Sequence, residues 1–432
     1  MHHDSIHLRL YADMAWLPLA QGVAEQGAAV FGLDHGKTLR LTMAVEELLA
    51  YLAGQSPGDM LEITITRRAC HILTEFAFAA RDADLWAMNI TACGISCSEE
   101  SMQAMGLLLA ARMCDGFEVR RHGGQVVLSL RMNRSYPGLD GEPVEHVAAR
   151  GALQVRTADD PARIKEACRL ACGLYPPALV PPSFATPGMV VDQLRAGDLH
   201  AALAEDAGGA VRGFIVWMQR SEASVSFCGP YVFARDDAQT ARALTDHLVA
   251  QVARTTANGI ISDLATADLP PGEFEALGEL PFTGNDDVPA PLPVWYRGLR
   301  EDNGVTVWAH AGLRPFLEQA YERLFLMRDI RPTQPAGEHR DARSVFATSL
   351  RPQASVALIT PMLDGADAGE NIRLHAGMLR AEGYRNILLH LDLSAGWQAD
   401  LPPLLEETGF APVMVLPFAS RADVVVYQHV RV

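Results

Sequence analysis

The stretch HAALAEDAGGAVRGFIVWMQR, residues 200–220, decides how the middle of the chain is expected to fold. Its two apolar segments flank AGGAVRG, whose glycines are typical of a hairpin turn, so it predicts two antiparallel strands. A further strand is expected at VSFCGPYVFA, then an amphipathic helix over 236–259 that ends at Asn258 and Gly259, then a strand at IISDLATA. A strand at 153–158 and two helices are expected before the hairpin.

The composition indicates globular domains, with 49% hydrophobic and 20% charged residues in a chain of 432. Because domains usually hold about 100 to 200 residues, two or three are expected. Two segments rich in proline, glycine and charge, at 131–146 and 331–343, are interpreted as linkers. They divide the chain into domains at 1–135, 150–330 and 344–432, and the strands and helices in all three predict an α+β protein.

The charge balance argues against two classes of partner. The chain has 36 Lys and Arg against 52 Asp and Glu, a formal net charge of -16, whereas nucleic acids and anionic membranes require concentrated positive charge. No apolar stretch approaches a membrane span, and the first residues lack the pattern of a signal peptide. We therefore expect a cytoplasmic protein without nucleic-acid or membrane partners. The seven cysteines are an odd number without a zinc-type spacing, so neither disulfides nor a metal site is expected.

The first 135 residues predict strands covered by helices. Period-two alternation indicates strands at 7–12, 61–68, 71–80 and 125–132, and helical spacing indicates helices at 19–33, 39–54 and 101–116, the last ending at Gly116. The buried face of the second helix is expected to contain Leu41, Ala44, Val45, Leu48 and Leu52. AVEELLAY, AFAARDADLWAMN and MGLLLAARMCDGFEVRRHGG follow in the order of the boxes of GHKL ATPases. The segment resembles the anti-sigma-factor serine kinases of that family, which implies an α/β sandwich.

This resemblance implies a site for ATP and magnesium. In that family a carboxylate and an Asn lie one helical turn apart, and Glu47 fits the carboxylate, whereas Tyr51 stands where Asn is expected. A phenol does not replace a carboxamide oxygen on Mg²⁺, so both ATP binding and phosphoryl transfer stay open. The residues that the resemblance places at the nucleotide are Glu47, Tyr51, Asp82, Asp84, Gly106 and Leu107.

The segment 150–330 resembles the GNAT acetyltransferases in the order of its strands and helices, with the quoted hairpin at its centre. In that family a glycine-containing loop before the long helix binds the coenzyme A pyrophosphate, which implies acetyl-CoA as a cofactor. Here that loop contains Arg235, Asp236, Asp237, Ala238 and Gln239. Two aspartates would repel phosphate, and they are well suited to cap the helix.

Several residues are candidates for acid or base chemistry. We assign Glu205 and Tyr231 of the GNAT-like segment, together with Glu47 of the first segment, as catalytic candidates. Asp206 and His247 are further candidates in the GNAT-like segment. The segment 344–432 resembles the back half of a second, partial GNAT unit through LLEETGF and the elements around it. His375, His390 and Asp392 lie nearest to a possible site there.

These patterns leave three functions open. The first is a bacterial regulatory protein that binds a protein partner through degenerate GHKL-like and GNAT-like domains, with a homodimer implied by the resemblance to anti-sigma kinases. The second is an acyl-CoA-dependent N-acyltransferase gated by ATP binding. The third is a serine kinase of an anti-anti-sigma partner. Whether the chain is an enzyme stays open at this point, and an acyltransferase is favoured over a kinase.

Overall fold

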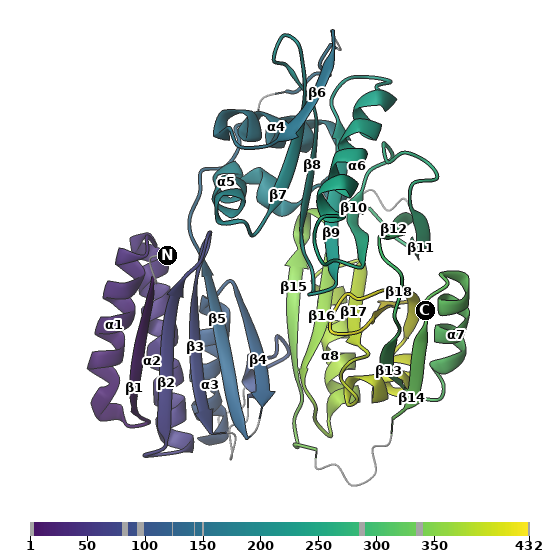
Figure 1. The fold of residues 1–432 in the computed structure, drawn as a ribbon. Helices are drawn as coiled ribbons and strands as arrows, with labels where there is room; N and C mark the ends of the chain where they lie inside the picture. The colour runs from purple at the N-terminus through teal and green to yellow at the C-terminus, as the bar shows by residue number, and fades with distance from the viewer. Residues whose placement is uncertain are drawn as a thin grey trace. The chain divides into compact units, whose positions relative to one another are not determined.

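The computed structural model describes residues 4–79, 85–92, 99–122, 124–141, 143–148, 151–284, 290–333 and 340–430, with the backbone alone at 99–104 and 122. It has several sheets and helices, which confirms the predicted α+β class (Figure 1). The chain forms two compact units, which comprise 1–135, 337–349 and 358–382, and 136–336, 350–357 and 383–432. Among the described residues, no helix has the length and apolar character needed to cross a bilayer.

The first unit contains a five-stranded sheet of order β1-β2-β3-β5-β4 in which all neighbours are antiparallel. Its elements are β1 (Ser5–Tyr11), η1 (Met14–Trp16), α1 (Leu17–Val30), α2 (His35–Gln55), β2 (Met60–Arg67), β3 (His71–Ala79), η2 (Trp86–Met88), α3 (Glu99–Met113), β4 (Gly116–His122) and β5 (Gln125–Asn133). The predicted order of elements is confirmed. One boundary was wrong: α3 ends at Met113, because Gly116 already pairs with Arg131 as the first residue of β4.

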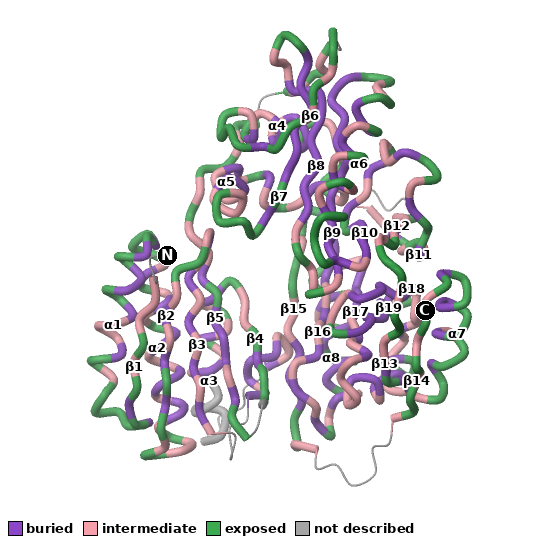
Figure 2. The backbone as a smooth tube through the Cα atoms, viewed as in Figure 1, coloured by how far each residue is buried: buried purple, intermediate pink, exposed green. Residues whose placement is uncertain are grey.

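The core of the first unit lies between this sheet and its helices. The five residues predicted for one face of α2 are all buried, and along β3 buried residues alternate with partly buried ones (Figure 2). Such alternation arises because successive side chains of a strand point to opposite faces of the sheet. The period of the apolar residues therefore fixed which face of each element is covered.

Residues from late in the chain complete this unit. They include β15 (Val345–Arg351) as far as Ser349, and α8 (Ala368–Ala381). The buried Asn89 side chain donates to the carbonyl of Ser344 at 2.9 Å and accepts from the amide of Phe346 at 2.8 Å. Asn371 on α8 donates to the same Ser344 carbonyl at 3.2 Å. The two bonds of Asn89 join segments more than 250 residues apart, and no local pattern in the sequence predicts them.

The second unit contains a seven-stranded sheet of order β11-β12-β10-β9-β8-β7-β6. Its elements are β6 (Leu153–Thr157), α4 (Pro161–Leu174), η3 (Pro177–Leu179), η4 (Pro182–Ala185), α5 (Pro187–Ala196), β7 (His200–Asp206), β8 (Val211–Gln219), β9 (Ser224–Val232), α6 (Ala238–Val252), β10 (Gly259–Ala265), β11 (Glu275–Leu280) and β12 (Leu292–Gly298). Neighbouring strands are antiparallel except β9 and β10, which α6 connects in parallel. The 200–220 hairpin is confirmed, but the long helix ends at Val252 and Gly259 starts β10.

The remaining elements are β13 (Val305–Ala309), α7 (Arg314–Arg323), β14 (Arg328–Pro332), η5 (Pro352–Ala354), β16 (Val356–Leu363), β17 (Asn386–Asp392), η6 (Gln398–Asp400), α9 (Pro402–Glu407), β18 (Phe410–Leu416) and β19 (Val424–His429). Strands β13 and β14 pair in parallel, and a five-stranded sheet has the order β15-β16-β17-β19-β18. From β16 onward, strands and helices follow as β16, α8, β17, α9, β18 and β19, and β15 precedes them.

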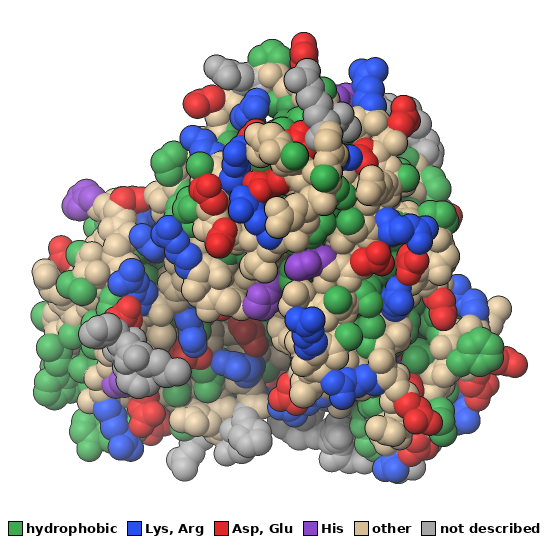
Figure 3. Space-filling model, turned by 45° about the horizontal axis from the view of Figure 1, so that its top comes forward, with side chains coloured by type: hydrophobic (Ala, Val, Ile, Leu, Met, Phe, Trp, Pro, Cys, Tyr) green, Lys and Arg blue, Asp and Glu red, His purple; other side chains and the backbone are tan. Residues whose placement is uncertain are grey.

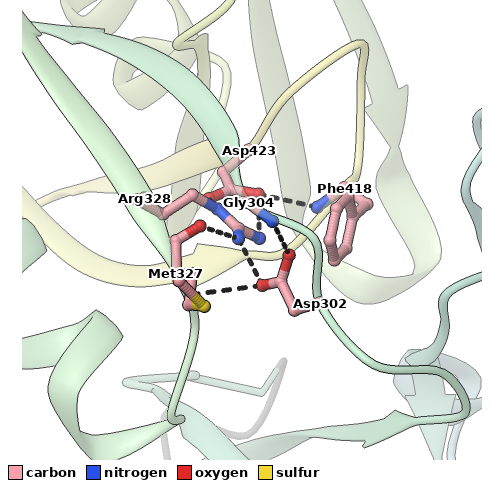
Figure 4. Close-up of polar contacts among 6 residues, drawn as sticks. All are labelled: Asp302, Gly304, Met327, Arg328, Phe418 and Asp423. Carbon is pink, nitrogen blue, oxygen red and sulfur yellow. Dashed lines mark hydrogen bonds and ion pairs between the residues drawn. The ribbon is translucent and has the colours of Figure 1, made fainter.

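A buried arginine joins three of these segments in the second unit. The fully buried guanidinium of Arg328 donates to Asp423 from Nε at 2.6 Å and from Nη2 at 3.2 Å, and to Asp302 at 2.5 Å. The same guanidinium lies 4.5 Å from the ring centroid of Phe418, whose amide donates to Asp423 (Figure 4). Arg328 also donates to the carbonyl of Met327 at 2.8 Å. Two carboxylates, this carbonyl and the ring of Phe418 thus compensate the burial of one cation.

Candidate functional site

The first candidate site is the N-terminus of α6, where the GNAT resemblance implies a phosphate. Asp237 caps this helix, because its carboxylate accepts from the amide of Thr240 at 3.2 Å. The Thr240 hydroxyl donates to the other carboxylate oxygen at 2.5 Å. The prediction that this aspartate caps the helix is confirmed.

The same carboxylate forms a buried ion pair with Arg212 on β8. Arg212 donates from Nε to Asp237 at 2.9 Å and also from Nη2, and each side chain is 6% exposed. Burial opposes ionisation of Asp237, but hydrogen bonds from Thr240 and Arg212 hold the pKa of its carboxyl below the ordinary value. The anion position at this helix N-terminus therefore contains a carboxylate of the protein itself.

A glycine permits the close approach of α6 to β8. A side chain at Gly213 would lie 2.7 Å from Thr240, 2.9 Å from Leu244 and 2.9 Å from the carbonyl oxygen of Tyr231. The missing Cβ lets the first turn of α6 settle on the strand that carries Arg212. By contrast, the other four residues of the loop, Arg235, Asp236, Ala238 and Gln239, are exposed.

The second candidate site lies where β9 and β10 end. Beyond the last pair of this parallel ladder, Ala265 with Gly229, backbone groups of β9 are bound by side chains. The Tyr175 hydroxyl accepts from the Val232 amide at 2.6 Å and lies 2.9 Å from the Val232 carbonyl and 2.6 Å from an Asp268 carboxylate oxygen. The Thr266 hydroxyl donates to the Pro230 carbonyl at 2.5 Å. Internal hydroxyl groups thus satisfy the strand groups that an extended ligand would otherwise pair with.

The two catalytic candidates of this unit share no hydrogen bond among the described residues. Tyr231 is fully buried, and its hydroxyl donates to the Leu179 carbonyl at 2.7 Å. Burial raises the pKa of Tyr231 well above its ordinary value, so this phenol stays protonated. Glu205 is 10% exposed at its side chain and pairs with Arg156 at 2.6 Å and with Arg163 at 3.7 Å. Each side chain already has a structural partner.

Of the other acid and base candidates, Asp206 and Asp392 accept hydrogen bonds that shape the backbone around them, and His247 packs against an aromatic ring. The Asp206 carboxylate accepts from the amides of Gly208 and Ala210 and thereby shapes the hairpin turn. His247 packs against Trp217, with ring centroids 6.3 Å apart, and burial lowers its pKa. Asp392 accepts from the Ser394 amide at 2.8 Å and from the Ser420 hydroxyl at 2.5 Å.

The two histidine candidates of the segment 344–432, His375 and His390, belong to different units. His375 is fully buried and donates to the Asn371 carbonyl at 2.9 Å, and burial lowers its pKa to about 4. For His390, burial and the nearby Arg220 and Arg351 lower the pKa to about 3. Both imidazoles are therefore neutral at physiological pH.

Two cavities flank η3 in the second unit. One of about 160 Å³ is bounded by the residues around η3 and η4 and by η5, and a smaller one of about 50 Å³ lies toward β10 and β17. Arg351 lines both. Sequence reasoning missed Tyr175, Arg212, Asp268 and Arg351. For Arg212 there was a signal, because a lone arginine in the apolar strand VRGFIVW requires a buried partner.

In the first unit, the predicted nucleotide residues lie on α2 and α3. A side chain at Gly106 would lie 2.5 Å from the Glu47 carboxylate, so these two residues are neighbours. Gly106 sits within α3, where its amide is a donor inside the helix and is not free for phosphate. Tyr51 and Leu107 are buried. Asp82 and Asp84 lie outside the described residues.

No metal site emerges in the parts of the chain that the structure describes. These contain no group of three or more His, Cys, Asp or Glu side chains that could hold an ion. Cys168 is buried and Cys172 is exposed, and neither forms a disulfide. Cys93 and Cys97 lie outside the described ranges.

Comparison with known proteins gives partial likenesses in structure. No described protein family and no curated protein matches the chain. Phosphinothricin acetyltransferase of Sinorhizobium meliloti, solved with acetyl-CoA, is 19% identical over 35% of this chain and 90% of its own, with a TM-score of 0.29. An N-acetyltransferase of Staphylococcus aureus is 14% identical over 35% of this chain and 100% of its own, with a TM-score of 0.27.

The RsbU and RsbW domains of Rv1364c from Mycobacterium tuberculosis give a likeness of another kind, 12% identical over 31% of this chain and 33% of that one, with a TM-score of 0.22. The chain thus has partial likenesses in structure to GNAT acetyltransferases and to the RsbU and RsbW domains of Rv1364c. At these identities and TM-scores they carry no argument about activity.

Proposed function

We propose that this chain is a regulatory protein that binds a protein partner. Its GHKL-like and GNAT-like domains keep the order of strands and helices of those families, but their phosphate-binding positions are altered. The observation that carries the proposal is the Asp237 carboxylate at the N-terminus of α6, held there by the buried Arg212. A phosphate would have to displace a carboxylate that already satisfies both the helix and the arginine. Binding of coenzyme A at this position is therefore unfavourable.

The first unit supports the same reading. The Gly106 amide lies inside α3, and the buried Tyr51 takes the place of the expected magnesium ligand. Several large apolar side chains are exposed on α1 and α2, namely Leu19, Val30, Leu39 and Met43, and hydrophobic side chains gather at the left edge of Figure 3 over this unit. Such side chains are typical of surfaces that contact proteins.

The proposal predicts that acetyl-CoA, coenzyme A and Mg-ATP leave the melting temperature of the full chain unchanged. A ligand with a Kd of about 10 µM, present at about 1 mM, would stabilise the native state by ~2.7 kcal/mol and would be detected easily. The measurement is a thermal-shift titration with each ligand. A saturable shift with acetyl-CoA would contradict the proposal for the second unit and favour the acyltransferase.

A second prediction concerns the exposed face of α1 and α2, for which we propose a second copy of the chain as partner. Leu39 and Met43 lie one turn apart on α2 and are 54% and 38% exposed, so charges at both should break an apolar contact. We expect the wild type to sediment as a dimer at micromolar concentration and Leu39→Glu/Met43→Glu as a monomer. Leu350→Glu, at an exposed leucine outside this face, serves as the control. A monomeric wild type would refute the dimer.

The acyltransferase remains the second candidate, because the smaller cavity is lined by Asp263, Leu264 and Ala265 at the end of β10. In that case Tyr175 and Thr266 would have to release the β9 backbone groups that they bind. An acetyl-CoA titration that saturates, followed by acetyl transfer to an amine, would establish it.

A further inference from the structure

The larger cavity of the second unit is built by two segments far apart in the sequence. The last turn of α4 contributes Cys172, and the connection between α4 and α5 contributes Pro177, Val180, Pro181, Pro182 and Ala185. The segment around η5 contributes Arg351, Gln353 and Ala354. The walls are mostly proline, valine and alanine, and the cavity has room for about 160 Å³. A cavity of this size in other proteins accepts a ring the size of benzene.

Arg351 is the unusual residue of this cavity. Its side chain is partly buried, yet among the described residues it has neither a hydrogen bond nor an ion pair. The nearby Asp263, which lines the adjoining cavity with Arg351, is already paired with Arg220 at 2.6 Å. The positive charge of Arg351 also contributes to the low pKa of His390. A guanidinium with no protein partner at the wall of an apolar recess can bind an anion there in place of water.

We propose that this cavity binds a small monocarboxylate with a compact apolar body, such as an aromatic or branched acid of about six to eight carbons. The carboxylate would accept two parallel hydrogen bonds from the Arg351 guanidinium, and the apolar body would lie against the prolines and Val180. The lining favours a carboxylate over phosphate, because one guanidinium among apolar walls does not replace the hydration of a doubly charged anion.

This inference goes beyond the proposed function, because it concerns a site without coenzyme A or nucleotide. The Asp237 cap and the Arg351 cavity can therefore be tested separately. A positive acetyl-CoA titration would refute the altered phosphate site and leave the carboxylate site untouched. Failure of carboxylate binding would likewise leave the proposed function standing.

The experiment uses the full chain and a thermal-shift and calorimetric titration with benzoate, phenylacetate and hexanoate. Benzyl alcohol and inorganic phosphate are the comparison probes. We expect at least one carboxylate to bind saturably, and Arg351→Gln to weaken its binding by about tenfold to hundredfold, because a charge-assisted pair is lost. Arg314→Gln, which removes an exposed arginine paired with Glu318, is the matched control and should leave the affinity unchanged.

A second readout reports on the location of the ligand. Cys172 is exposed as a residue, but partial burial of its thiol in the cavity wall raises the pKa of the thiol to about 11. Its alkylation at mildly alkaline pH is therefore slow and depends on access to the cavity. We expect the bound carboxylate to slow alkylation of Cys172, measured by peptide mass spectrometry. Ala185→Phe is the second variant, to be used if Arg351→Gln does not fold. It places a ring at an exposed position of the cavity wall, and should abolish both the binding of the carboxylate and the protection of Cys172.

Three results would overturn the proposal. The first is that none of the carboxylates binds at 10 mM, a concentration about a thousandfold above a Kd of about 10 µM. The second is equal affinity in the wild type and in Arg351→Gln. The third is binding of benzyl alcohol as tight as that of benzoate, since an uncharged analogue cannot use the guanidinium.

Discussion

Replacing Asp237 with alanine is expected to lower the free energy of unfolding of the second unit by about 3–5 kcal/mol, the usual effect of leaving one member of a buried ion pair without its partner. The Arg212 guanidinium, 6% exposed, would lose its carboxylate, and α6 would lose its cap. The measurement is urea unfolding followed by tryptophan fluorescence.

The neighbouring aspartate provides the control. Asp236 is exposed and has a backbone φ of 53°, a conformation that asparagine also accepts, so Asp236→Asn should change stability by less than about 0.5 kcal/mol. If Asp237→Ala were as mild as this control, the ion pair would contribute little, and the argument against a phosphate at this helix would lose its support.

The same residue sets a pH dependence with a defined sign. Because the pKa of Asp237 is lowered in the folded state, its contribution to stability is complete above the unfolded value of about 3.9 and is lost as the pH falls through the folded pKa. The difference in stability between wild type and Asp237→Asn should therefore be constant from pH 6 to 8, and should shrink in acid.

The second large effect is expected at Arg328. Arg328→Ala should destabilise the second unit by about 3–5 kcal/mol, because it leaves the fully buried Asp423 carboxylate and Asp302 without their common cation. The cost includes the contact of the guanidinium with Phe418 (Figure 4). Chemical unfolding of the full chain measures the change.

A matched control lies three residues away. Arg331 pairs with Asp329, and both side chains are more than half exposed, so Arg331→Ala should cost no more than about 0.5 kcal/mol. Comparable losses in the two variants would show that burial is not what makes the Arg328 cluster strong. The Arg328→Met variant tests whether an apolar chain of similar length restores any stability.

These two clusters differ in what they mean for function. The Arg328 cluster joins three chain segments and lines neither cavity, so we assign it to stability alone. The Arg212 and Asp237 pair stabilises the protein at the position where the resemblance implies a cofactor. A buried carboxylate at this position would repel a phosphate group. The pair therefore argues against binding of coenzyme A at this helix, whereas the Arg328 cluster carries no such argument.

The nature of most elements could be predicted from the sequence. The residues of one face of α2 and the 200–220 hairpin follow from the spacing of apolar residues and glycines within one segment. Two helix ends were placed too far along the chain, at Gly116 and Gly259, because each glycine opens a strand and a glycine after a helical pattern looks the same in both roles. The Asp237 cap was predictable, since capping involves only neighbouring residues.

What only the tertiary structure decided is which distant side chains meet. Arg212 reaches Asp237 because β8 and α6 pack closely at Gly213, and Arg351 faces the α4 and α5 connection across some 170 residues of chain. Helix period, strand alternation and caps are local interactions, so the sequence by itself determined them. Ion pairs and cavities depend on strand register and on close approach between elements, and these exist only once the chain has folded.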